Sequence, residues 1–211
     1  MHEKIIVVGA GVGGLTAAAL LSQRGFDVTV LEAHVEPGGC AATFFHQGYR
    51  FDAGATLVGG FQLNGPHDLV ARELGIEWPI RSIDPAMLVH LPDRLITCYS
   101  DAGRWREERL RAFGGSTEKF WAEQERAANA VWNLAARIPS WPISSIQDAF
   151  GLIPAVRPEL ILAAPLAFTN MQAWSQRLGA TDRTFKTYLD AQLLISAQAI
   201  AADTNALYGA A

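Results

Sequence analysis

The sequence has few cysteines, few charged residues and no surplus of positive charge. Only Cys40 and Cys98 occur among its 211 residues, and they form no CxxC pair. This spacing argues against a disulfide framework and against a structural zinc site, and it fits a reducing compartment such as the cytoplasm. Charged residues make up 18%, with 21 acids, 17 bases and a net charge of −4. A basic surface for nucleic acid is therefore not expected.

Long hydrophobic runs are also scarce, and only residues 5–22 approach the length of a membrane span. A signal peptide or a membrane anchor is one explanation of this run. The run contains four clustered glycines after a β-branched stretch, which a signal sequence does not need: Gly9, Gly11, Gly13 and Gly14. Half of all residues are hydrophobic, which also argues against disorder. We therefore expect a folded cytoplasmic protein with a substantial core.

The first thirty residues predict a β-α-β unit. Two β-branched segments, Lys4–Val8 and Asp27–Leu31, have the composition of buried strands. Residues 12–24 between them predict a helix, which Gly25 ends because glycine adopts positive φ easily. A connection of this length favours parallel strands with a right-handed crossover.

The character of the chain changes after about residue 66. Residues 67–74 predict a short helix, and residues 86–91 and 94–99 predict two strands joined by a turn at Pro92-Asp93. From residue 101 onward the chain is predicted to be mostly helical, and Ser116 is expected to cap a long helix. Further helices are predicted over residues 159–168, 171–178 and 182–199.

The glycines after the first strand match the dinucleotide-binding fingerprint GxGxxG. Gly9 permits the tight turn, Gly11 lets the backbone approach a pyrophosphate, and Gly14 allows the helix to pack closely. Ala10 and Gly13 complete the loop, so we expect their backbone to contact the ligand as well. The helix that follows directs its free N–H groups and its positive dipole end at the phosphates.

Glu32 stands at the end of the second predicted strand, where Rossmann domains carry an acid for the ribose. Its carboxylate suits an adenosine ribose with free hydroxyls and would repel a 2′-phosphate, which disfavours NADP. NAD and FAD share the same adenosine diphosphate half, so Glu32 does not separate them. The alternative is a glycine-rich turn followed by a surface glutamate.

The segment after Glu32 carries a family resemblance. Residues 36–56 are EPGGCAATFFHQGYRFDAGAT, with the core GGxxxTF followed by GYRFDAGAT. This segment resembles the flavin-dependent amine oxidase and carotenoid desaturase superfamily, nearest to the carotenoid desaturases and isomerases. Residues 84–86, 105–109 and 189–207 more faintly resemble the cyanobacterial-type carotenoid 3′,4′-desaturase. The resemblance implies FAD as cofactor and the following further contact residues: Gly38, Gly39, Cys40, Gly54, Ala55 and Thr56.

Physical reasoning about the second glycine pair agrees with this resemblance. Gly38 and Gly39 would let the backbone approach the part of a long cofactor beyond its pyrophosphate, although a plain surface turn is an alternative. Cys40 stands where amine oxidases often have arginine, and this difference points away from amine oxidation. A covalent flavin or a nucleophilic thiol is a weaker hypothesis than a small buried thiol, because no partner base is visible.

The predicted fold class is α/β, with a Rossmann-like FAD-binding βαβ unit and a mostly helical α+β substrate domain. Residues 1–66 are expected to form the N-terminal part of the FAD-binding domain, and residues 67–211 an incomplete substrate-binding domain. In the resembled family the chain is more than twice as long, and closing strands return after the substrate domain. We therefore expect a truncated chain that a missing C-terminal segment or a second chain completes.

The resemblance implies desaturation or cis–trans isomerisation of a carotenoid polyene. The flavin would perform the hard step, so no catalytic side chain and no metal site is predicted. The substrate is expected to be a long apolar polyene, and the protein to make peripheral membrane contact. Alternatives are a non-catalytic dinucleotide-binding remnant and a flavoenzyme of the amine oxidase or retinol saturase type. The expected apolar lining, which an ordinary helical core would also explain, is Leu160, Ile161, Leu162, Leu166, Phe168, Met171, Trp174, Leu189, Leu193, Leu194 and Ile195.

Overall fold

The computed structural model describes residues 3–54, 57–137, 144–151 and 157–211. The chain divides into two compact units, Met1–Pro79 and Ile80–Ala211. The division comes later than the expected one after residue 66, because α2 (Pro66–Leu74) packs against α1 (Val12–Gln23) of the first unit. Gln23 of α1 donates its Nε2 proton to the carbonyl of Glu73 at 2.6 Å, which ties the two helices together.

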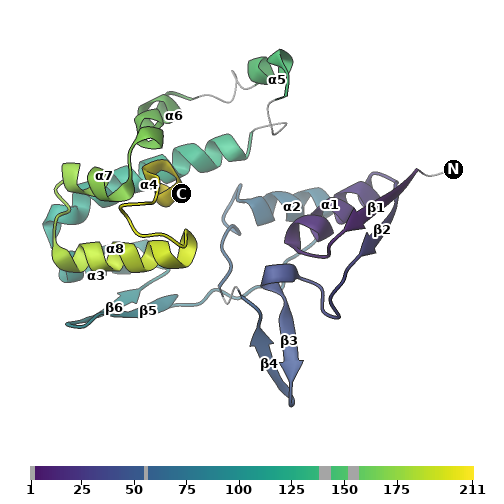
Figure 1. Ribbon diagram of the computed structural model, residues 1–211, viewed down its shortest axis with the longest axis horizontal. Helices are drawn as coiled ribbons and strands as arrows, with labels where there is room; N and C mark the ends of the chain where they lie inside the picture. The colour runs from purple at the N-terminus through teal and green to yellow at the C-terminus, as the bar shows by residue number, and fades with distance from the viewer. Residues whose placement is uncertain (1–2, 55–56, 138–143, 152–156) are drawn as a thin grey trace. The chain divides into compact units, whose positions relative to one another are not determined.

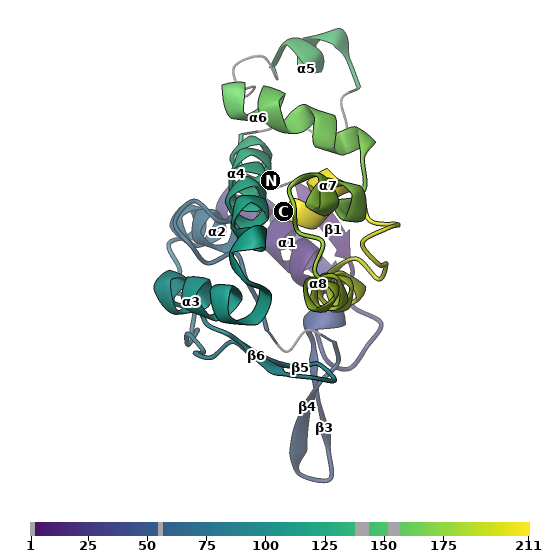
Figure 2. The same ribbon diagram turned by 90° about the vertical axis from the view of Figure 1, so that its left-hand side faces the viewer.

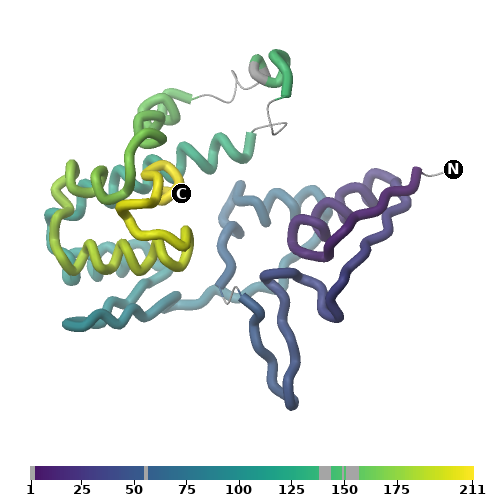
Figure 3. The backbone as a smooth tube through the Cα atoms, in the orientation of Figure 1, coloured from purple at the N-terminus to yellow at the C-terminus, as the bar shows by residue number. Residues whose placement is uncertain are grey.

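The first unit begins with the predicted β-α-β arrangement (Figure 1). Strands β1 (Lys4–Val8) and β2 (Asp27–Leu31) pair in parallel, with Lys4 opposite Asp27 and Val8 opposite Leu31. Helix α1 connects them, and Gly25 ends the connection at a φ of 88°, as its position predicts. Figure 3 traces this path, out along β1, back through α1 and out again along β2. The prediction of a parallel pair is confirmed.

One face of this two-stranded sheet is open and carries three exposed apolar side chains beside Lys4, Asp27 and Thr29. Ile6 and Val8 of β1 are 66% and 83% exposed, and Leu31 of β2 is 51% exposed. The alternate positions on both strands are half-buried, and α1 packs against both strands. Parallel sheets usually have both faces covered, so this open face with its three apolar side chains has the character of an incomplete layer.

Residues 43–52, which have no clear predicted structure, form a β-hairpin. Strands β3 (Thr43–His46) and β4 (Tyr49–Asp52) pair antiparallel, with Phe44 opposite Phe51. The turn residues Gln47 and Gly48 have φ values of 49° and 81°, and two successive positive values are typical of a tight hairpin turn. Gln-Gly is a weaker turn signal than Asn-Gly, which explains why this hairpin escapes detection in the sequence.

The second unit begins with a hairpin and two helices. Strands β5 (Met87–His90) and β6 (Leu95–Cys98) pair around the predicted turn at Pro92-Asp93. Helix α3 (Ala102–Phe113) follows, and α4 (Glu118–Ala135) is the long helix. The expected cap at Ser116 is wrong, since a 3-10 turn, η2 (Gly115–Thr117), separates the helices and makes Thr117 the N-cap.

The remaining elements of the described residues are helices: α5 (Ile146–Gly151), α6 (Pro158–Ala163), the 3-10 helix η4 (Ala164–Phe168), α7 (Met171–Arg177), α8 (Arg183–Ser196) and α9 (Ala206–Ala210). The single helix predicted over residues 159–168 is wrong, because the α-helix ends before Pro165 and a 3-10 turn continues. Proline lacks the N–H group that an α-helix interior requires. Asp182 caps α8 by accepting the Phe185 N–H at 2.9 Å.

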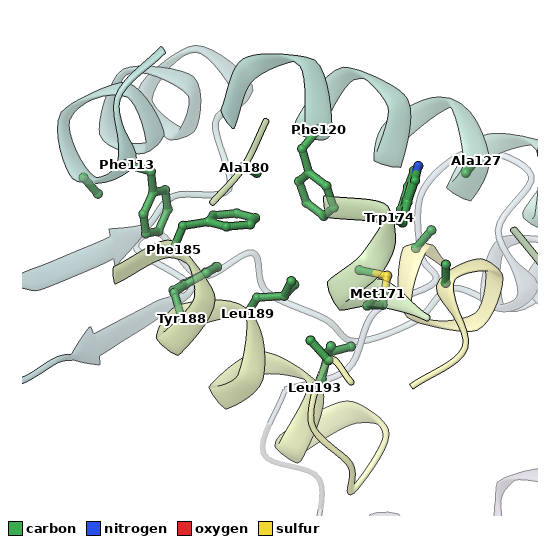
Figure 4. Close-up of a cluster of buried hydrophobic side chains, with 14 of the residues drawn as sticks. Phe113, Phe120, Ala127, Met171, Trp174, Ala180, Phe185, Tyr188, Leu189 and Leu193 are labelled. Carbon is green, nitrogen blue, oxygen red and sulfur yellow. The ribbon is translucent and has the colours of Figure 1, made fainter. Parts of the chain in front are cut away.

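Helices α3, α4, α7 and α8 belong to the second unit (Figure 2), and aromatic side chains from these four helices form its core (Figure 4). Phe120 and Phe185 are both 0% exposed, and their ring centroids lie 5.1 Å apart in an edge-to-face arrangement. Four of the residues expected to line a substrate channel belong to this core: Met171, Trp174, Leu189 and Leu193. The ordinary helical core, the alternative explanation, is therefore correct for Met171, Leu189 and Leu193, whereas Trp174 also lines a cavity together with Leu160, Leu162 and Leu166 of the expected lining.

A buried carboxylate joins α3 to the hairpin. Glu108 of α3 accepts the backbone N–H of Thr97 in β6 at 2.9 Å. Arg111 donates to both carboxylate oxygens of Glu108, at 2.6 and 2.7 Å. These hydrogen bonds, that of Arg111 foremost, hold the pKa of Glu108 below its ordinary value.

Candidate dinucleotide-binding site

The glycine-rich loop lies between β1 and α1. Gly9 has a φ of 99° and donates its N–H to the carbonyl of Leu31 at 2.7 Å, which holds the loop onto β2. A Cβ atom on Gly14 would lie 2.0 Å from the carbonyl oxygen of Gly9. Helix α1 can start this close to the strand only because residue 14 has no side chain, and Gly9 adopts its backbone at no steric cost.

Gly11 differs from these two glycines, because the fold itself does not require it. Its φ of −73° and ψ of 174° are open to any residue, and a Cβ atom there would meet nothing within 4 Å. Gly11 is the N-cap of α1 and provides no side chain for the N–H groups of the first turn. No side chain caps these N–H groups, so with the positive end of the helix dipole they are available to an anion such as a diphosphate.

Glu32 is held by two backbone hydrogen bonds. Its Oε1 accepts the N–H of His34 at 2.8 Å, and its Oε2 accepts the N–H of Ala10 at 2.6 Å. The bond from His34, followed by that from Ala10, lowers the pKa of Glu32. An ionised carboxylate has about four acceptor positions, so both oxygens can still accept a ribose hydroxyl. The sequence gives no sign that Ala10 and His34 bind Glu32, because both act through their backbone.

The second glycine pair is built onto the first loop. Gly38 donates its N–H to the carbonyl of Ala10 at 2.7 Å, and Gly11 and Gly38 form a parallel β-bridge. A Cβ atom on Gly39 would lie 3.3 Å from the Cα of Gly11. Gly38 and Gly39 have φ values of 119° and 60°. The segment is therefore not an independent surface turn, since it joins with the fingerprint loop in a single backbone surface.

Buried Ala10 links the three parts, because its N–H binds Glu32 and its carbonyl binds Gly38. The remaining predicted residues lie near the second loop or outside the described residues. Cys40 lies in η1 (Gly39–Ala41), and its thiol is free and exposed, which corrects the expectation of a buried thiol. A Cβ atom on Gly54 would lie 2.6 Å from the carbonyl oxygen of Cys40, so the backbone of Gly54 packs against η1. Ala55 and Thr56 fall outside the described residues.

Two other kinds of site are absent from the described part of the chain. There, no group of three or more histidine, cysteine, aspartate or glutamate residues is arranged to hold a metal ion. Among the same residues, no helix combines the length and the apolar composition that crossing a membrane requires.

Comparisons with known proteins agree with this geometry. Residues 7–73 match the NAD(P)-binding Rossmann-like domain family. Wild-type putrescine oxidase bound to putrescine superimposes with a TM-score of 0.52 and 21% identity, covering 100% of this chain and 41% of the oxidase. The structural likeness shows the fold.

Two relatives show what the chain is similar to in sequence. Prolycopene isomerase 2, chloroplastic, from an Oncidium hybrid cultivar is 31% identical over 193 residues, or 90% of this chain. The 4,4'-diapophytoene desaturase (4,4'-diapolycopene-forming) of Methylomonas sp is 36% identical over 140 residues, or 64% of this chain. The chain is similar in sequence to these two enzymes. It spans about a third of the first protein and about a quarter of the second, at 31% and 27% of their lengths.

Proposed function

We propose that this chain binds FAD and is part of an enzyme that desaturates or isomerises a carotenoid polyene. The observation that carries the proposal is the contact between the two glycine loops, with Gly38 bonded to Ala10 and Gly39 beside Gly11. A longer dinucleotide such as FAD uses a backbone surface that continues beyond its pyrophosphate, whereas the GxGxxG loop alone would suit NAD. The names of the two relatives, an isomerase and a desaturase, support the polyene chemistry.

Different segments of the first unit would bind different parts of the cofactor. The diphosphate would lie on the loop Gly9, Ala10, Gly11, Gly13 and Gly14, at the start of α1. Glu32 would accept hydrogen bonds from the ribose, and its negative charge would disfavour a 2′-phosphate. The segments Gly38–Cys40 and Gly54–Thr56 would continue toward the flavin end. Bound there, the flavin would supply hydride transfer, and this chain would orient it.

The open sheet face supports a partner for the first unit. Ile6, Val8 and Leu31 expose apolar side chains on a parallel sheet, which folds of this kind cover on both faces. We infer that further polypeptide, in the same chain or as a second chain, covers this face and completes the domain. A flavin held in a completed domain would be shielded from water, which polyene chemistry requires.

In this proposal the second unit binds the polyene and contacts the membrane. Ile161 and Phe168, from α6 and η4, are 64% and 92% exposed. Exposed apolar side chains of this kind suit peripheral contact with a bilayer, the phase in which a polyene dissolves. The free thiols Cys40 and Cys98 are consistent with a cytoplasmic location.

The experiment that tests cofactor binding is a titration of residues 1–211 with FAD, with NADP and with ADP as a partial ligand. FAD and ADP should bind, and NADP should bind more weakly. Failure of FAD to bind would refute the flavin proposal. For the polyene, conversion of lycopene-type substrates in detergent with added FAD and the completing polypeptide is the readout. FAD binding without conversion under those conditions would identify a dinucleotide-binding remnant.

A further inference from the structure

The second unit contains a cavity away from the glycine loops. It has a volume of about 590 Å³ and lies between α4, α6 and η4, with Trp174 of α7 contributing to the wall. Sites for small molecules commonly measure about 300–1,000 Å³. Its apolar lining includes Ala127, Ala130, Leu134, Leu160, Ala163 and Leu166.

Small residues on α4 leave room for this cavity. Ala127 and Ala130 are buried one helical turn apart and belong to the same stripe as Leu134. Helix α6 packs against α4, and its Ala163 is also buried (Figure 1). Larger side chains at these positions would fill the space between the helices, so the alanines make the site concave.

The polar part of the lining is rich in arginine. Arg137 follows α4 and Arg157 precedes α6; both are exposed, and neither side chain makes an ion pair or a hydrogen bond with the described residues. Arg126 is engaged by Glu123 at 2.6 Å. The lining as a whole has three arginines against two glutamates, Glu123 and Glu159, which leaves a net charge of +1. A cavity with an apolar wall and two guanidinium groups that are unpaired within the described residues is complementary to an apolar molecule that carries an anion.

We propose that this pocket binds a free long-chain carboxylic acid as its anion. The alkyl chain lies on the alanine and leucine lining, and the carboxylate is bound by Arg137 and Arg157. Guanidinium groups match a carboxylate with paired, charge-assisted hydrogen bonds. A hydrocarbon polyene has no group for the arginines, so the site takes a different ligand from the proposed substrate. The inference goes beyond the function proposed above and does not depend on it.

The test compares oleate with oleyl alcohol, which have the same chain and different head groups. Calorimetric titration of residues 1–211 with each, below its aggregation concentration, should show oleate binding about tenfold tighter or more, as charge-assisted bonds imply. The double variant Arg137→Gln/Arg157→Gln should lower oleate affinity to that of the alcohol. Glu159→Gln should strengthen oleate binding, because it removes the opposing charge.

Two controls separate this site from general effects. Arg177→Gln removes an exposed cation of α7 outside the cavity and should leave oleate binding unchanged. Ala130→Phe fills the cavity and should abolish binding of both ligands while circular dichroism shows the helices intact. FAD affinity, a property of the first unit, should not change in any of these variants, so the two proposals can fail separately.

Several outcomes would overturn the proposal. These are equal affinity for oleate and oleyl alcohol, no binding of oleate, or a double arginine variant that still prefers oleate. Binding to phosphatidylglycerol vesicles that depends on Arg137 and Arg157, without binding of monomeric oleate, would also overturn it. That last result would assign the arginines to a membrane surface instead.

Discussion

The backbone N–H of Ala10 donates a 2.6 Å hydrogen bond to Oε2 of Glu32. This bond joins the loop after β1 to the residue that follows β2, so the diphosphate part and the ribose part of the candidate site are connected. Because the carbonyl of Ala10 also accepts the N–H of Gly38, the same residue positions the second glycine loop. The candidate site is thus organised by backbone bonds before any ligand contributes.

Replacing Glu32 should weaken FAD binding through the ribose and through the loop. Glu32→Ala removes the acceptor of both N–H groups, and we expect an affinity loss of roughly tenfold, as for an unpaired polar contact. Glu32→Gln keeps one acceptor oxygen and should lose less. Flavin fluorescence titration measures both. An Ala variant that binds FAD as tightly as the parent would show that the ribose assignment is wrong.

Substitutions of Gly11 and Gly14 should affect different properties, the first ligand binding and the second stability. Gly11→Val places its side chain in open space, so we expect unchanged thermal unfolding and loss of FAD and ADP binding. Gly14→Ala places Cβ 2.0 Å from the Gly9 carbonyl oxygen, so unfolding should occur at lower temperature. Gly115→Val in η2, which also meets nothing within 4 Å, is the matched control and should affect neither property. Normal FAD binding by the Gly11→Val variant would contradict the proposal that the glycine fingerprint binds the diphosphate.

Glu108 makes the stability of the second unit depend on acid pH. Its pKa is lowered in the folded state, so its contribution is complete above its ordinary pKa and is lost as pH falls through the depressed value. Glu108→Gln should cost about 1–3 kcal/mol at pH 7, since it weakens the bonds to Arg111 and Thr97. The variant should also lose less stability than the parent between pH 5 and pH 2, which denaturant unfolding would show. Glu123→Gln, at an exposed pair, should cost less than about 0.5 kcal/mol.

The aromatic core should tolerate little truncation. Phe185→Ala removes a fully buried ring that contacts Phe113 and Phe120, and we expect a cost of about 3–5 kcal/mol. Phe168→Ala removes a ring that is 92% exposed, so its cost should stay within about 0.5 kcal/mol. Urea unfolding monitored by tryptophan fluorescence compares the two. Equal costs would contradict the packing described for this core.

The open face of the first unit should bind hydrophobic dyes. Residues 1–211 should enhance the fluorescence of anilinonaphthalene sulfonate, because Ile6, Val8 and Leu31 are exposed together. Ile6→Thr/Val8→Thr keeps the β-branched shape and should reduce dye binding and aggregation. The same substitutions should weaken association with a completing polypeptide. Undiminished dye binding in the double variant would place the dye elsewhere.

The sequence was sufficient for the first unit wherever a local pattern carries the information. β-Branched runs predicted β1 and β2, and positive-φ glycines ended the helices α1 and α2. The resemblance in residues 36–56 is confirmed by the relatives. The hairpin of residues 43–52 was not predicted because its turn is Gln-Gly and not Asn-Gly, the strongest hairpin signal. The start of α4 was misplaced because a 3-10 turn precedes the helix. The binding roles of the named site residues stay predictions.

The apolar residues of the second half show that a sequence pattern does not determine which of them are buried. Met171 and Leu193 are buried in the core, whereas Ile161 and Leu162 are exposed, although all four had the same expected role. Composition determined that these positions are apolar. Which of them face the core depends on how α6, α7 and α8 pack. This packing is the result of many contacts between residues far apart in the chain.

The sequence by itself determined the β-α-β unit, the glycine fingerprint, the acid at its end and the family resemblance. Each depends on neighbouring residues or on fixed spacing, so local conformational preference suffices. Only the tertiary structure decided that Gly38 bonds to Ala10, that Glu32 is held by two N–H groups, and that small alanines open a cavity beside Arg137 and Arg157. Neither the partner of a backbone N–H group nor the packing of two helices can be predicted from residue type, because both depend on which distant segments the fold brings together.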